Sequence, residues 1–502
     1  SSLTLLILSC NCLMRVVVIT DSILKLSVIV KEEIMALWWE WTRCVWSLRA
    51  ACSREITFFW MVVALLGMSV RADLAGVTSF VRAGFIDQAY YRALLNLFHS
   101  PALGLDPLLS LWVNLSMRLF TPVMENGFVV FVADGIKAAK EGKKMPGVKS
   151  LHQESADNSK PPYIMGHSFQ VIGLLVQGLA GAFAAVPLVS RIHEGLIFSN
   201  RDRRTLLDKL AKMFLEVAGV VQRPAILVAD AYYASRKIIC PLLGAGHHLI
   251  AKAKINTVAF LKVADVELRG PGRPKLYGAK IRLRDLFDDT ALFVSAPSPV
   301  YGERGVIITF RCIELLWRPV GCLVKFVLVN HPNRGRIILM CTLLSLNPLT
   351  IIRLYGIRFK IEVSFKQAVW TVGSYAYHFW MKMMVPIRKH SGNQYLHMRS
   401  DKYRQHVRRK MDAYHRYVAL ACTAQGLLQH LAFNYHALVW ACFRSWLRTM
   451  KTDAVPSEQV VAMALRSFLP EFLLSKGNES LLTKFILDHA APDRLPNFSA
   501  AA

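Results

Sequence analysis

Two aspartates follow apolar segments that are typical of buried β-strands. Asp134 ends the stretch "FVVFVAD", and Asp230 ends "AILVAD". Burying an unpaired charge costs on the order of several kcal/mol, so an acid at a strand tip is either a turn-former or a site residue. Gly135 directly after Asp134 favours the turn. Asp230 is followed by "AYYAS", without an immediate Gly or Pro, which favours the site.

A third acid, Glu362, stands in the basic and apolar stretch "RLYGIRFKIEVSFKQAV" (353–369). Arg358 precedes it by four residues and Tyr355 by seven, so the three side chains share one face if this stretch is helical. Three carboxylates from two strand tips and a facing helix can hold two divalent metals roughly 4 Å apart. One metal would activate water or a 3′-hydroxyl, and the other would stabilise the leaving oxygen. Hard oxygen ligands favour Mg²⁺ or Mn²⁺.

The composition limits the class of protein that carries these acids. The chain has 502 residues, of which 54% are hydrophobic, enough for about two to four domains with proper cores and neither disordered nor fibrous. Its formal net charge of +27 indicates an anionic partner, either nucleic acid or an anionic membrane. Its ten cysteines include no C-x-x-C pair, which favours reduced thiols in a cytosolic protein.

A membrane protein is the first alternative to exclude. The apolar run 58–68 has only eleven residues, too few for a helix that spans a bilayer. The run 172–189 is longer but contains Gln177 and Pro187, which predicts two strands and a turn. We therefore expect no membrane partner. The chain begins with Ser1, and we expect residues 1–34 to be an extension of doubtful nativeness, with Met35 as the natural start.

The elements that must position the acids follow in order along the chain. Helical periodicity over 35–120 predicts either a helix-turn-helix that enters a DNA groove or an ordinary helical bundle. The segment 121–254 predicts a strand meander, the amphipathic helix 205–221, and further strands at 225–230 and 247–254, an α/β layout. Residues 255–350 predict a β-rich insertion. Helical spacing resumes in 351–390, which holds the third acid, and in a C-terminal helical region, 391–502.

Three quoted stretches together resemble a known family. They are "FVADGIKAAKEGKKMPGVKSLHQESADNSKPPYIMGHSFQ", "ILVADAYYASRKI" and "YGIRFKIEVSFKQAV…GSYAYHFWMK". Their order is similar to that of the DDE transposases of bacterial insertion sequences, in the branch with a Tyr-Arg-Glu-Lys signature. The resemblance spans roughly residues 35–450. It implies an RNase H-like catalytic core interrupted by a β-rich insertion, behind a helical DNA-binding domain.

The same resemblance implies roles for individual residues. Asp134, Asp230 and Glu362 match the three catalytic acids and would bind two Mg²⁺ or Mn²⁺ ions per site. Tyr355 and Arg358 match the first two signature positions. The signature Lys is expected where this chain has Val369. Lys366, four residues after Glu362, would take over the phosphate contact, and the departure puts a hairpin intermediate in doubt.

Several basic residues are further candidates for DNA contacts. A basic loop after Asp134 would face the cleaved strand. The segment 388–410 holds eight Lys or Arg against one acid, which favours a DNA-facing element over a solvated helix. "RGPGRPK" (269–275) is compatible with minor-groove insertion or with an exposed turn. The predicted DNA-binding set is Tyr355, Arg358, Lys366, Lys137, Lys140, Lys143, Lys144, Arg273, Arg404, Arg408, Arg409 and Lys410.

Two further side chains have alternative interpretations. Trp317 could stack on a flipped base or belong to the core, and His167 could lie near the site or be structural.

The sequence thus predicts a DNA transposase that cleaves transposon ends and transfers strands to target DNA. We expect it to be bacterial, cytoplasmic and nucleoid-associated, and to act as a homodimer on paired ends. A metal-dependent endonuclease of the same fold without strand transfer is one alternative. A domesticated DNA-binding protein without catalysis is another, although the intact acids Asp134, Asp230 and Glu362 argue against it.

Overall fold

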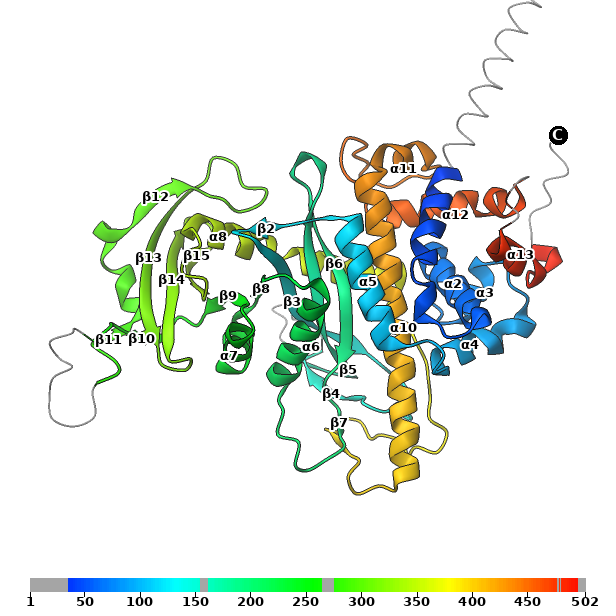
Figure 1. The fold of residues 1–502 in the computed structure, drawn as a ribbon, viewed down its shortest axis with the longest axis horizontal. Coiled ribbons are helices and arrows are strands. Elements are labelled where there is room, and N and C mark those ends of the chain that lie inside the picture. Colours follow the sequence, from blue (N-terminus) through cyan, green and yellow to red (C-terminus); the bar gives the residue numbers. More distant parts are fainter. Residues whose placement is uncertain (1–34, 154–160, 264–274, 476–477, 479, 495–502) are drawn as a thin grey trace, which may run out of the picture.

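The structure is a computed structural model that describes residues 35–494 except 154–160, 264–274, 476–477 and 479. The predicted extension 1–34 and Arg273 lie outside the described residues. Figure 1 shows a broad sheet that extends to one end of the molecule through β10–β15. The first and last helices of the chain lie together at the other end. The α/β class predicted from the sequence is confirmed.

The central element is a mixed sheet of fourteen strands among the described residues. Its main path runs in the order β1-β5-β3-β8-β9-β15-β14-β13-β10-β11, and β2, β4, β6 and β12 pair with strands of this path. The strands of the first part are β1 (Thr121–Pro122), β2 (Met124–Glu125), β3 (Phe128–Ala139), β4 (Lys149–His152), β5 (Tyr163–Gln177), β6 (Phe183–Ile192), β8 (Ala225–Ala229) and β9 (His248–Ala253).

The middle of the sheet combines antiparallel and parallel pairing. Strands β3, β5 and β6 form an antiparallel meander, after which β8 pairs parallel to β3 and β9 pairs parallel to β8. Every residue of β8 is buried, as expected for a parallel strand covered on both faces. The run 172–189 falls in β5 and β6, as predicted.

The strands between 255 and 350 extend the same sheet. β15 pairs antiparallel with β9, so the edge of the parallel strands is covered and does not remain open. The strands of this part are β10 (Val258–Phe260), β11 (Lys280–Arg282), β12 (Val294–Pro297), β13 (Ile307–Trp317), β14 (Cys322–His331) and β15 (Gly335–Cys341). The predicted domain boundaries stay predictions.

Helices cover both faces of the sheet. α6 (Leu206–Val221) begins at a capping box of Thr205 and Asp208, and with α7 (Arg236–Gly244) it shares the larger hydrophobic core. On the opposite face, α8 (Pro348–Ile357) and the start of α9 (Lys360–Gln367) share a second core with β3, β8 and β9. Asn347 caps α8 by accepting from the Leu349 amide. This second face is the one that positions the acids.

The chain ends form a helical region around one long helix (Figure 1). α10 (Asp401–Asn434) packs against β6 and against α2, α4, α5 and α12. Residues 35–46 are helical as well. The other helices are α2 (Glu55–Val70), α3 (Thr78–Ala83), α4 (Tyr91–His99), α5 (Leu105–Leu119), α11 (His436–Cys442), α12 (Glu458–Leu474) and α13 (Leu481–Asp488), and a short strand pair joins β7 (Leu196–Ile197) to β16 (Gln394–Tyr395).

The apolar run 58–68 lies in α2, where nearly every side chain is buried within the bundle. Its hydrophobicity is therefore explained by protein packing on all sides. Across the part of the chain that the structure describes, no helix has both the length and the apolar character needed to cross a bilayer.

One predicted helix is wrong. Sequence spacing favoured a helix through 370–389, but after a π-helical turn at Ala368–Val372 the chain is irregular up to β16. Gly373 has a left-handed φ of 64° and ends the helix. Beyond it Tyr375, Tyr377 and Phe379 are buried, whereas Ala376 is half-buried and His378 and Trp380 are exposed, a period of two that belongs to extended chain.

Candidate active site

The two aspartates lie side by side at the carboxyl end of parallel strands. The last paired residues of β3 and β8 are Ala133 and Ala229, so Asp134 and Asp230 follow at the same level. Val132 and Val228, two residues earlier, belong to the core under α8. Because side chains alternate along a strand, both aspartates face α8 and α9.

The prediction that both acids end their strands is half right. Asp230 directly follows β8, as expected. Asp134 instead lies inside β3, which runs on to Ala139 because the long strand β5 continues to pair with it, from Val171 opposite Asp134 onward. Only the parallel pairing stops at Ala133. The turn predicted at Gly135 is therefore wrong, and Asp134 is held by a continuous ladder.

Glu362 approaches from the helical face. Arg358 and Phe359 separate α8 from α9 but keep right-handed helical dihedrals, with φ of −48° and −56°. The predicted common face is thus preserved across the junction: the Arg358 guanidinium donates to Asp134 (Nη1 to Oδ2, 3.0 Å) and to Glu362 (Nη2 to Oε1, 3.2 Å). The Tyr355 hydroxyl donates to Asp230 Oδ1 at 3.3 Å.

The charges of this group are coupled. Burial raises the pKa of Asp134; the Gly135 amide and Arg358 work against this, and the nearby charges of Asp230 and Glu362 raise the pKa further. Burial, together with the Asp230 carboxylate, raises the pKa of Tyr355 to about 12 although Arg358 opposes it. Three acids thus share one edge of the sheet with a single arginine bridging two of them.

The three carboxylates do not surround a single ion position. Their oxygens do not all lie within 4.8 Å of one another, the spacing expected around a single ion. Two ions roughly 4 Å apart, each with oxygen ligands at about 2.1 Å, would place the outer carboxylates farther apart than that. Three hard oxygen donors of net negative charge fit Mg²⁺ or Mn²⁺. Asp134, Asp230 and Glu362 are the residues that would hold them.

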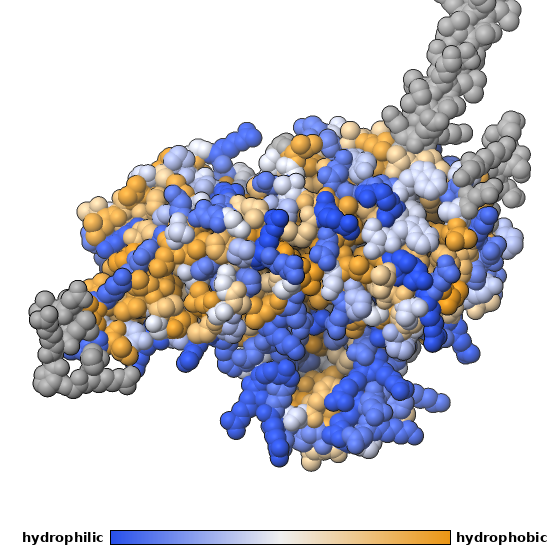
Figure 2. All heavy atoms as spheres, viewed as in Figure 1, coloured by the Kyte–Doolittle hydropathy of each residue, from blue (hydrophilic) through white to orange (hydrophobic). Residues whose placement is uncertain are grey.

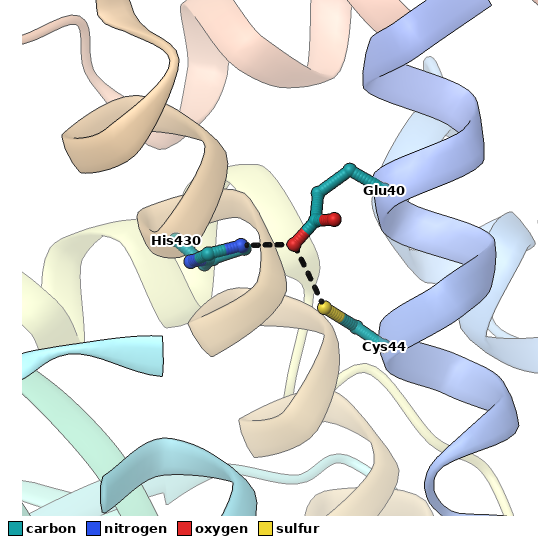
Figure 3. Close-up of side chains that lie close together, drawn as sticks. All are labelled: Glu40, Cys44 and His430. Carbon is teal, nitrogen blue, oxygen red and sulfur yellow. Dashed lines mark hydrogen bonds and ion pairs between the residues drawn. The ribbon is translucent and has the colours of Figure 1, made fainter. Parts of the chain in front are cut away.

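A second cluster has ligand-type side chains at single-ion spacing. Among the described residues, Glu40, Cys44 and His430 are the one set of three whose ligand atoms all lie within 4.8 Å (Figure 3). Figure 3 shows Glu40 and Cys44 on the helix of residues 35–46, with His430 of α10 pointing at them. This set was not predicted, because His430 is 390 residues from Glu40 in the chain.

Hydrogen bonds already satisfy the ligand-type atoms of this second cluster without a metal ion. Glu40 accepts two bonds from the Arg43 guanidinium, at 2.6 and 2.7 Å, and a thiol contact from Cys44 at 3.5 Å. Asn434 Nδ2 donates to Leu119 O at 3.0 Å and lies 2.8 Å from His430 Nδ1, so Nδ1 accepts and Nε2 carries the proton. His430 Nε2 then donates to Glu40 at 2.7 Å.

The electrostatics of this cluster agree with its hydrogen bonds. Burial opposes the charge on Glu40, yet hydrogen bonds from Arg43 and His430 lower its pKa to about 2. Burial and the Glu40 carboxylate raise the pKa of the Cys44 thiol to about 12, so it stays protonated. Every ligand atom is already engaged, and the cluster joins the first helix to α10.

The predicted loop lysines separate into two groups. Lys137, Lys143 and Lys144 are exposed, with Lys137 on β3 itself and the other two beyond it. Lys140 is a correction, because it is only 6% exposed and cannot reach DNA. Its ammonium donates to the carbonyls of Tyr375 and Tyr377 and lies 3.8 Å from the centre of the Tyr377 ring. Burial lowers the pKa of Lys140 to about 7.

The structure shows the positions of Val369, which stands where the signature has a lysine, and of Lys366, the suggested replacement. Val369 lies in the π-helical turn and packs, partly buried, against the main core. Lys366 is exposed on α9, one helical turn after Glu362. A lysine at 369 would have to leave the core to reach a phosphate, whereas Lys366 already faces solvent.

The basic residues of α10 lie on a hydrophilic lobe. Figure 2 shows polar side chains gathered there, where Figure 1 places the start of α10 and β7. Arg408 and Arg409 are exposed. Arg404 forms an ion pair with Asp401. Lys410 turns back to His99 Nε2 at 2.9 Å, so it is less available than predicted.

Two other candidates are structural. His167 is fully buried between the Tyr377 hydroxyl and Pro146 O, at 2.6 and 2.9 Å, and burial lowers its pKa to about 3. Trp317, at the end of β13, packs partly buried against the core. In both cases the structural alternative is confirmed.

Two cavities lined by neighbours of the site residues in the chain or in space were not predicted. One of about 320 Å³ is lined by Tyr355, Arg358 and Phe359 together with apolar residues of β14 and β15. Another, of about 680 Å³, is lined by Tyr232, two residues after Asp230, and by the cations Arg204, Lys209 and Arg408. The residues that line these cavities come from separate elements of the chain. Only Tyr232 could have been expected from its position next to a candidate acid in the sequence.

Comparison of the chain with protein-family models and with curated proteins found no match. The resemblance described above therefore depends on the three motifs and on the geometry of the residues they contain.

Proposed function

We propose that this chain is a DNA transposase with an RNase H-like catalytic core. The observation that carries the proposal is the meeting of Asp134, Asp230 and Glu362 at one sheet edge, with Tyr355 and Arg358 between them. These residues come from three separate sequence motifs up to 228 positions apart. A solvated surface acid would not require two other acids, an arginine and a tyrosine to be packed around it.

The sheet order supports the fold. An antiparallel meander β3-β5-β6, followed by β8 and β9 added in parallel beside β3, is the arrangement expected of an RNase H-like core. The strands β10–β15 enter between β9 and the helix of the third acid, where the resemblance implies an insertion.

The residues divide the work of phosphodiester chemistry. Asp134, Asp230 and Glu362 would hold two Mg²⁺ or Mn²⁺ ions, which when bound activate the attacking hydroxyl and stabilise the leaving oxygen. Arg358 and Lys366 would bind phosphate, and the Tyr355 hydroxyl, with its raised pKa, remains a hydrogen-bond donor. Arg408 and Arg409 on the basic lobe, with Lys143 and Lys144 beyond β3, would neutralise the DNA backbone.

The biological setting follows from the reaction. Strand transfer requires two transposon ends, so we propose a homodimer on paired ends, acting on the bacterial nucleoid in the cytoplasm. An endonuclease of the same fold would cleave DNA without joining the released ends to target DNA.

The test is Mg²⁺-dependent cleavage and strand transfer on DNA that carries the element's own ends. Asp230→Asn should abolish both reactions, and the matched control Asp288→Asn, an exposed acid of the insertion 3.7 Å from Arg336, should leave them unchanged. Equal activity of wild type and Asp230→Asn would refute the assignment of the three acids. Cleavage without joined products would favour the endonuclease.

A further inference from the structure

Arg358 holds a position between two of the proposed metal ligands. Its two terminal nitrogens bind one oxygen each of Asp134 and Glu362, at 3.0 and 3.2 Å. Among the described residues no other cation forms an ion pair with any of the three acids. Arg358 is 14% exposed and Asp134 24%, so solvent screens this contact weakly, whereas Glu362 is 57% exposed and its contact is partly screened.

A divalent ion cannot share this position with the guanidinium. Arg358 binds Asp134 Oδ2 and Glu362 Oε1, and a metal ion at about 2.1 Å from these same oxygens would lie in the place of the guanidinium. Two cations held by the same oxygens would also repel each other strongly in a partly buried site. Metal binding must therefore move Arg358, Glu362 or both.

The surroundings of Arg358 allow it to move. Its Nε is buried and has no hydrogen-bond partner among the described residues, so the bridged position leaves one donor unused. The 320 Å³ cavity next to the guanidinium is lined by Tyr355, Phe359 and Tyr301 as well as by Arg358. A phosphate oxygen there would accept from the planar fork in a bidentate manner, which two separate carboxylates do not offer.

We propose that Arg358 is a stand-in cation, which holds Asp134 and Glu362 together in the metal-free protein and is displaced when divalent metal binds. The displaced guanidinium then becomes the phosphate ligand, so metal loading and DNA contact are coupled through one side chain. The proposal rests on the proposed metal site and adds that Arg358 competes with metal for it. A residue that only contacts DNA would not affect metal affinity in the absence of DNA.

The experiment measures Mn²⁺ binding to the full chain without DNA, by electron paramagnetic resonance of free Mn²⁺. Arg358→Gln should bind Mn²⁺ about tenfold more tightly than wild type, and Arg358→Lys, which keeps a charge but loses the fork, should fall between them. Arg336→Gln, an exposed arginine paired with Asp288, should bind as wild type does. Unchanged or weaker binding by Arg358→Gln, with a native circular dichroism spectrum, would overturn the proposal.

A second measurement follows Arg358 in the unaltered protein. Phenylglyoxal modification of Arg358, quantified by mass spectrometry, should accelerate severalfold when Mn²⁺ is added, while modification of Arg336 stays constant. Equal rates with and without Mn²⁺ would show that the guanidinium is not displaced.

Glu362→Gln separates failure of this inference from failure of the proposed function. If Glu362→Gln weakens Mn²⁺ binding but Arg358→Gln does not strengthen it, the metal site stands and competition by Arg358 is refuted. If wild type and Glu362→Gln bind Mn²⁺ equally, the metal site itself is refuted.

Discussion

Two clusters in this molecule contain carboxylates next to an arginine, but they differ in how far their negative charge is balanced. Glu40 is one acid surrounded by donors from Arg43, Cys44 and His430. The edge cluster has three acids and one arginine, so its negative charge is only partly balanced. Ligand-type side chains at close spacing therefore do not identify a metal site. The ratio of acidic groups to cations favours the edge cluster, where three carboxylates share a single guanidinium.

The largest expected effect is on the rate of DNA cleavage, which should fall for a substitution in the edge cluster and change little for one in the Glu40 cluster. Asp134→Asn should lower DNA cleavage by on the order of 10³-fold or more, since it removes the carboxylate between the other two. Glu40→Gln should change cleavage less than about threefold at a temperature where it is folded. Gel assays of cleavage at saturating Mg²⁺ check both. A similar loss in both variants would remove the distinction between the clusters.

For the free energy of unfolding, we expect the larger loss in the Glu40 cluster and the smaller loss in the edge cluster. Glu40→Gln should lower the free energy of unfolding by about 3 kcal/mol, because it removes the negative charge and turns one accepting oxygen into an NH2 donor that faces the donors of Arg43, His430 and Cys44. Glu362→Gln should cost less than about 1 kcal/mol, because the Glu362 side chain is 57% exposed and its ion pair is partly screened. Urea denaturation at pH 7 measures both values.

The pH dependence of Glu40 provides a check on the same comparison. Its folded pKa of about 2 lies below the ordinary 4.5, so its contribution is complete above pH 4.5 and is lost as the pH falls toward 2. The difference in stability between wild type and Glu40→Gln should shrink over that range. A constant difference would contradict the lowered pKa.

Lys140 is a buried charge with carbonyl and ring partners but no acidic partner within the described part of the chain. Burial lowers its pKa from 10.5 to about 7, so between these values the unfolded chain binds the proton that the folded chain releases. Relative to Lys140→Met, wild type should gain roughly 1 kcal/mol of stability per pH unit above pH 7. Urea denaturation at pH 7, 8 and 9 measures this slope. Parallel curves would show that the two carbonyls and the Tyr377 ring keep the ammonium charged.

The smallest expected effect concerns DNA affinity. Arg409→Gln should weaken DNA binding a few fold at moderate salt and reduce the slope of log affinity against log salt by about 1, because one exposed phosphate contact is lost. Lys140→Met should leave that slope unchanged, since its ammonium is buried. Fluorescence anisotropy at four salt concentrations distinguishes them. Equal slopes for wild type and Arg409→Gln would place the DNA away from the lobe.

Local signals predicted the elements well where they were strong. The amphipathic run that became α6 and the apolar run that became β8 have a clear period or a continuous buried pattern. The segment after Gly373 was misjudged because aromatic residues two apart also fit parts of a helical spacing. The end of β3 was misjudged because β5 decides how far that strand continues.

Burial was the property that local sequence predicted least. Lys140 and Lys143 belong to one basic stretch, yet the first lies under Tyr375 and Tyr377 and the second faces solvent. Those carbonyls come from a segment more than 230 residues away. Charge alone therefore did not distinguish a structural lysine from a DNA-facing one.

The sequence by itself determined the candidate acids Asp134, Asp230 and Glu362, the helical face shared by Tyr355, Arg358 and Glu362, and the α/β class, because helical periodicity and apolar strand runs are local properties. Tertiary structure alone decided that Arg358 bridges Asp134 and Glu362 and that Glu40 is satisfied by His430. These contacts join residues hundreds of positions apart, and only the packing of α8 on the sheet and of α10 on the first helix brings them together.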